Sequence, residues 1–165
     1  MSSTQGIRRV RPHVRLSKPS TVVLGVILVV AVLIGPSVAI FFSVVASLFV
    51  LVACIGLHEA GHAAAAHALG FDVVEVRLGL FDSATAYEAD ERTAHDRVLC
   101  ALAGPAASLS LAIVFGVAAW VAGPDPVSFP AQLAFLNLVV ALANLVPLKG
   151  TDGWEIVAGL RGEAD

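Results

Sequence analysis

The sequence has few charged residues, and this scarcity excludes most soluble folds. Only 14% of its 165 residues are Asp, Glu, Lys or Arg, whereas 58% are hydrophobic and the mean hydropathy is +0.87. A soluble domain carries about 25% charged residues. The composition therefore predicts an integral membrane protein, a single helix bundle that has the lipid bilayer as its surroundings.

Cysteine is also scarce, with only Cys54 and Cys100, both in apolar segments. Their spacing matches neither a zinc knuckle nor a disulfide framework. We interpret both as packing residues, with the alternative that Cys54, one helical turn before His58, lines a site there. The 10 basic and 13 acidic residues give a net charge of -3, and nothing in their distribution favours nucleic-acid binding.

Uncharged runs are long enough to cross a bilayer more than once. The segment from Pro19 to Leu57 contains no charged side chain. As one helix it would extend about 58 Å at 1.5 Å per residue, whereas a bilayer core is about 30 Å thick. Gly35-Pro36 is the strongest breaker in this run and predicts a turn. Four transmembrane helices are expected, at about residues 20–35, 38–69, 93–122 and 130–147.

The basic residues are distributed unevenly between the two ends of these spans. The turns near Gly35 and Gly123 contain no Lys or Arg, and all 10 basic residues lie on the other side. The positive-inside rule then places both termini in the cytoplasm. We expect a basic cytoplasmic tail over residues 1–19, most simply disordered, a membrane-embedded domain over 20–157 and a short C-terminal tail over 158–165.

The segment between the second and third spans changes its periodicity. Val74 and Val76 alternate with Glu75 and Arg77, a period of two that is typical of a strand. We expect a small β-hairpin at the membrane surface over about 72–89; the alternative is an ordinary interfacial loop. The fold class is thus an all-α polytopic membrane protein with one surface hairpin.

One pentapeptide, His58-Glu59-Ala60-Gly61-His62, stands out in the second span. Residues at i and i+4 share one face of a helix, so His58 and His62 can hold one metal ion while Glu59 stands beside them. Counting from the turn at Gly35 places this H-E-x-x-H motif near the cytoplasmic boundary. An ionisable cluster at that depth indicates a functional site.

A second polar cluster follows the fourth span at the same boundary. It runs from Asn144 through Pro147 to Asp152-Gly153. Catalytic zinc normally takes three protein ligands and leaves one position open, and two histidines with a carboxylate form an established set. Asp152 is the candidate third ligand; the alternative is a surface aspartate in a turn.

Together these motifs resemble the site-2 protease family of intramembrane zinc metalloproteases. The resemblance rests on the H-E-x-x-H motif at 58–62, on Gly104-Pro105 in the next core helix, and on the N-x-x-P-x-x-x-x-D-G motif at 144–153. It covers about residues 40–157. Ser108 stands where many members carry asparagine, and the residues between Pro147 and Asp152 depart from the usual pattern.

The resemblance implies a role for five residues. His58, His62 and Asp152 would bind one zinc ion per chain, Glu59 would be the general base, and Asn144 would help to hold the substrate. The chain would be a minimal member without a PDZ or CBS domain, in a bacterial-type plasma membrane.

The implied activity is hydrolysis of a peptide bond within or near the cytoplasmic end of a substrate transmembrane helix. The expected partner is a transmembrane protein or peptide substrate. A regulatory membrane protein is a further candidate partner. The alternative is a catalytically inactive relative that binds membrane helices as a scaffold, although such a protein would not need Glu59. A metal transporter fits less well, because the spans lack ionisable groups except at one end.

Overall fold

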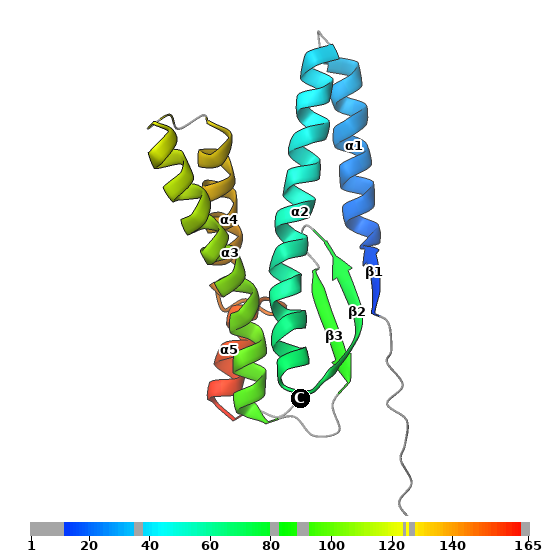
Figure 1. The fold of residues 1–165 in the computed structure, drawn as a ribbon. Coiled ribbons are helices and arrows are strands. Elements are labelled where there is room, and N and C mark those ends of the chain that lie inside the picture. Colours follow the sequence, from blue (N-terminus) through cyan, green and yellow to red (C-terminus); the bar gives the residue numbers. More distant parts are fainter. Residues whose placement is uncertain are drawn as a thin grey trace, which may run out of the picture.

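The computed structural model describes residues 12–34, 38–79, 83–88, 93–123, 125 and 128–162. Figure 1 shows two helical hairpins that lean apart at one end and approach each other where α2 lies beside α3. The sheet lies against α2, and α5 lies beside the start of α3. In chain order the elements of the described part are β1 (His13–Leu16), α1 (Lys18–Ile34), α2 (Val38–Ala68), β2 (Asp72–Leu78), β3 (Ala84–Glu88), α3 (Ala94–Ala122), α4 (Phe129–Leu145) and α5 (Asp152–Leu160).

Helix α3 begins at a threonine whose side chain caps it. At the start of α3, the Thr93 hydroxyl accepts a hydrogen bond from the Asp96 N–H, and the Asp96 carboxylate accepts one from the Thr93 N–H, each 3.1 Å long. This reciprocal capping box satisfies two backbone donors. Ser128 precedes α4, which has a proline in its first turn. The four predicted long helices are confirmed as helices, each with bounds within two residues of those expected.

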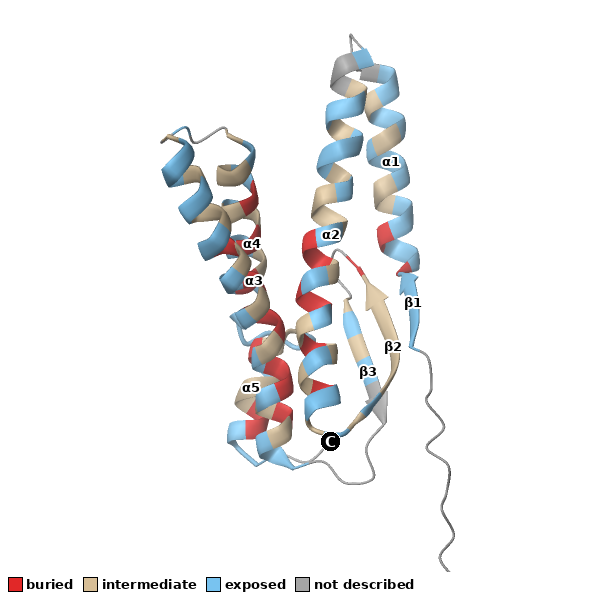
Figure 2. Ribbon diagram, viewed as in Figure 1, coloured by how far each residue is buried: buried red, intermediate tan, exposed pale blue. Residues whose placement is uncertain are grey.

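Two of the helices, α2 and α3, are long and apolar enough to cross a membrane. Only 11% of the apolar window in α2 is buried inside the protein, whereas the core helix of a soluble fold would be mostly buried. Figure 2 shows the buried residues gathered where α2 and α3 face each other, with exposed residues on the outer faces. The helices α1 and α4 are apolar but shorter, and their crossing of a membrane stays a prediction.

The described strands form one sheet in the order β1-β2-β3. β2 and β3 are antiparallel, with Val76 opposite Thr85, so the predicted hairpin is confirmed; its turn at 80–82 lies outside the described residues. β1 runs parallel to β2, and the Arg15 guanidinium donates to the Glu75 carboxylate at 2.7 Å. The expectation of a disordered tail is therefore wrong for residues 13–16, because these residues pair with a strand far along the chain.

The short helix α5 was not expected, and the predicted boundary at residue 157 lies inside it. Its N-cap is Thr151, whose hydroxyl accepts a hydrogen bond from the Trp154 N–H. The Arg97 guanidinium, on the first turns of α3, donates to the Glu155 carboxylate at 2.8 Å. Arg97 is buried, so this ion pair holds α5 against the start of α3.

Candidate metal centre

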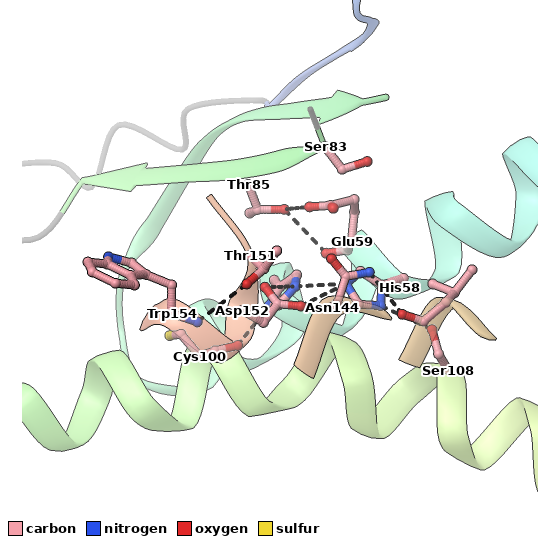
Figure 3. Close-up of polar contacts among 12 residues, drawn as sticks. His58, Glu59, Ser83, Thr85, Cys100, Ser108, Asn144, Thr151, Asp152 and Trp154 are labelled. Carbon is pink, nitrogen blue, oxygen red and sulfur yellow. Dashed lines mark hydrogen bonds and ion pairs between the residues drawn. The ribbon is translucent and has the colours of Figure 1, made fainter. Parts of the chain in front are cut away.

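Three side chains converge between α2, α3 and α5. His58 and His62 lie one turn apart on α2 and are 3% and 7% exposed. Asp152, the first residue of α5, points toward them (Figure 3). The His58 Nε2 atom lies 3.1 Å from Asp152 Oδ2, the His62 Nε2 atom lies 3.2 Å from Asp152 Oδ1, and the two Nε2 atoms are 3.2 Å apart. The structure thus brings together the three predicted ligands.

These separations fit a tetrahedral zinc site. With zinc–ligand bonds of about 2.0–2.2 Å, neighbouring ligand atoms in a tetrahedron lie about 3.3 Å apart. Gly104 on α3 provides the space, because a Cβ atom there would lie 2.2 Å from His62 Nε2 and 2.8 Å from His58 Nε2. Only a residue without a side chain leaves room beside these nitrogens. The donor set and the space therefore both fit a zinc ion.

The second nitrogen of each histidine ring has its own partner. His62 Nδ1 lies 2.7 Å from the carbonyl oxygen of Cys100. A carbonyl oxygen only accepts, so Nδ1 carries the proton and the Nε2 lone pair is left for a metal. His58 Nδ1 lies 3.0 Å from the hydroxyl of Ser108, and the same assignment holds when Nδ1 donates to it. Such outer contacts fix the ring orientation of metal-binding histidines.

The Asp152 carboxylate is suited to a cation. Burial opposes ionisation of Asp152, but the adjacent imidazoles of His58 and His62 outweigh burial, so the pKa of Asp152 lies below its usual range. The carboxylate is then ionised at neutral pH. Its negative charge faces the two imidazole nitrogens, where a divalent ion would lie.

Glu59 lies beside the cluster and faces the sheet. Its side chain is 2% exposed, and its carboxylate lies within 4.8 Å of ligand atoms of His58 and His62. The hydroxyl of Thr85 on β3 donates to Glu59 Oε2 at 2.8 Å. The carboxylate is thus near the candidate metal position and is hydrogen-bonded by the hairpin.

A pocket of about 350 Å³ opens onto this centre. Glu59, His62 and Asp152 line it together with small residues, and its remaining walls come from β3, the start of α3 and the first turns of α5. A pocket of this size, with a carboxylate and metal-binding groups on one wall, can take a segment of extended peptide.

Two predictions about nearby residues have different outcomes. Asn144, the predicted substrate-binding residue, donates to the Val140 carbonyl of its own helix at 2.9 Å and is not among the pocket-lining residues. Its substrate role stays a prediction. Cys54 accepts a hydrogen bond from the buried amide of Asn137, and the cysteine that lines the pocket is Cys100.

Three contributors to the site were missed in the sequence. Gly104 was identified only as part of the Gly104-Pro105 motif, although it lies against the candidate metal position. Ser108 follows Gly104 by four residues, so the helical period could have placed both on the face toward His58. Thr85 had no such signal, because its contact with Glu59 depends on how the sheet lies on α2.

Comparisons with known proteins found relatives that are named as zinc metalloproteases. No protein-family model matches the chain. Rip3 of Mycobacterium tuberculosis, named as a zinc metalloprotease, is 37% identical over 112 residues, which are 65% of this chain and 28% of that protein. The protein sll0528 of Synechocystis sp., also named as a zinc metalloprotease, is 32% identical over 115 residues, 67% of this chain and 30% of that protein.

The fold is similar to that of a solved structure, the site-2 protease from Methanocaldococcus jannaschii. The TM-score is 0.70 at 19% sequence identity, over 90% of this chain and 66% of that one. The sequence relatives and the shared fold together support membership of the site-2 protease family. The chain spans less than a third of the length of the curated relatives that it matches.

Proposed function

We propose that this site-2 protease relative is an intramembrane zinc metalloendopeptidase that cleaves a peptide bond within or near the cytoplasmic end of a substrate transmembrane helix. One observation carries the proposal. The Nε2 atoms of His58 and His62 and the carboxylate of Asp152 surround the space beside Gly104, with Glu59 next to them. A purely structural metal site would have no use for this additional buried carboxylate.

We also propose four spans with both termini on the cytoplasmic side of a plasma membrane of bacterial type. The apolar, exposed outer faces of α2 and α3 support contact with lipid. Two 17-residue apolar helices, α1 and α4, accompany them and would cross a thinned or locally hydrated part of the bilayer. The positive-inside rule supports the orientation.

Each residue of the site would have its own role in hydrolysis. Zinc, when bound, would polarise the scissile carbonyl and acidify a water molecule so that a nucleophile forms near neutral pH. His58, His62 and Asp152 would hold the ion. Glu59 would take a proton from the attacking water and return it to the leaving amine. Asn144 would help to hold the substrate.

The substrate must expose its backbone before it can react. Carbonyl groups of a transmembrane helix are hydrogen-bonded within the helix, and each unpaired group in lipid costs several kcal/mol. An extended segment that pairs with a strand regains such bonds. β3 lies beside Glu59 and lines the same pocket, which supports its use as that strand.

The proposal is tested with purified protein reconstituted in vesicles with zinc and a model transmembrane substrate, whose products are mapped by mass spectrometry. We expect wild type to cleave near the cytoplasmic end of the substrate and Glu59→Gln to retain zinc without cleaving. Glu75→Gln is the matched control, because Glu75 lies on β2 and pairs with Arg15 away from the pocket. Equal cleavage by wild type and Glu59→Gln would refute the mechanism. Binding of transmembrane segments without cleavage would favour an inactive scaffold.

A further inference from the structure

Thr85 connects the hairpin to the carboxylate of Glu59. Its hydroxyl oxygen lies 2.8 Å from Glu59 Oε2 and 3.4 Å from the backbone oxygen of Glu59. A threonine hydroxyl has one hydrogen to donate, and the shorter contact with an ionisable oxygen is the stronger one. Figure 3 shows the two side chains pointing toward each other across the gap between β3 and α2.

The register of the β2–β3 hairpin determines that Thr85, and no neighbour of it on β3, contacts Glu59. Side chains along a strand alternate between the two faces. Ala84 and Ala86 are exposed, whereas Thr85 between them is half-buried toward α2. Thr85 lies opposite Val76 of β2, so the hairpin register determines which β3 side chain reaches Glu59. A slip by one residue would bring an alanine methyl group to Glu59 instead of a hydroxyl.

A general base must be held within about 2.6–3.2 Å of the proton that it abstracts. A glutamate side chain has several rotatable bonds, and small misplacements of reacting groups lower rates strongly. We propose that Thr85 is a positioning residue for Glu59: its hydroxyl holds Oε2 so that Oε1 faces the water molecule that attacks the peptide. This inference rests on the proposed function, in which Glu59 is the general base.

The proton balance follows from this arrangement. The water O–H bond breaks as Oε1 gains the proton, and the water oxygen bonds to the carbon of the scissile peptide. The C–N bond then breaks, and the proton passes from Oε1 to the nitrogen of the leaving amine. The Thr85 hydroxyl keeps its own proton throughout and donates to Oε2 in both states. Strand β3, which would also hold the substrate backbone, is thus the element that orients the base. The alignment of the substrate and the orientation of Glu59 then both depend on the register of the β2–β3 hairpin.

Three variants in the reconstituted protein test the role. Thr85→Val keeps the shape and β-propensity of the side chain and removes the hydroxyl. We expect it to lower kcat about 10-fold or more with KM and zinc content unchanged, a smaller loss than that of Glu59→Gln. Thr85→Ser restores the hydroxyl and should recover kcat to within about threefold. Thr21→Val makes the same substitution in the first turns of α1, where the hydroxyl donates to the Ser17 carbonyl, and should leave kcat unchanged.

An infrared measurement on zinc-free protein tests the contact without proteolysis. With ¹³C-labelled glutamate, the difference spectrum between wild type and Thr85→Val should contain a shifted carboxyl band that is absent in a Glu59→Gln background. An unchanged spectrum, an equal loss of kcat in Thr85→Ser and Thr85→Val, or a change confined to KM would overturn the proposal. A wild type that cleaves no substrate would instead overturn the proposed function.

Discussion

Replacing Gly104 with alanine perturbs the candidate metal position directly. The new Cβ atom would lie 2.2 Å from His62 Nε2 and 2.8 Å from His58 Nε2, well inside the 3.0 Å that Cβ contacts essentially always exceed. The His62 ring would have to move by roughly 1 Å and the His58 ring by a few tenths of an ångström, whereas zinc–nitrogen distances vary by only about 0.2 Å. The rings cannot turn away freely, because their Nδ1 atoms contact Cys100 and Ser108. Zinc affinity should therefore fall by at least about 100-fold.

Competition with a chromogenic chelator measures this loss in detergent-solubilised protein. Gly116→Ala is the matched control, because it lies on the same helix and its added Cβ would meet nothing closer than Ala134 at 3.9 Å. Alanine is favoured over glycine in a helix by about 1 kcal/mol, so both variants should remain folded and the control should bind zinc normally. Wild-type zinc affinity in Gly104→Ala would refute the location of the site.

Two further substitutions test the surroundings of the centre. Ser108→Ala removes the partner of His58 Nδ1 and should weaken zinc binding about 10- to 100-fold without abolishing it, as measured by the same competition; unchanged affinity would mean that the contact does not orient the ring. Asn137 is fully buried, and its Oδ1 atom has no partner among the described residues. Asn137→Leu should therefore leave the unfolding free energy unchanged or raise it by about 1 kcal/mol in denaturant titrations, and a loss above about 2 kcal/mol would contradict this.

The parts of the site that could be predicted are those set by local periodicity. His58 and His62 belong to one helix, so their spacing of four residues alone places them on one face. Asp152 could be matched to them only by its depth in the membrane and by the family motif at 144–153, and neither says which atoms meet. The structure provides the missing part, because the Arg97–Glu155 ion pair and the cap of α5 place that helix against α3.

The elements that were not predicted depend on contacts between residues that lie far apart in the sequence. Strand β1 has four residues and pairs in parallel with β2 about sixty positions later, so the segment carries no local signal of its own. The Thr85–Glu59 contact similarly joins two elements whose relative placement is a tertiary property. Helix α5 is short and begins directly after its N-cap, Thr151, where the sequence indicated only a polar cluster after the fourth span.

The most direct test of the account is X-ray absorption at the zinc edge of the zinc-loaded wild-type protein. The account predicts one zinc ion per chain with two imidazole nitrogens at about 2.0–2.1 Å and oxygen ligands from Asp152 and solvent at about 2.0–2.2 Å. A sulfur ligand at about 2.3 Å, or zinc binding that survives replacement of both His58 and His62 by alanine, would contradict it.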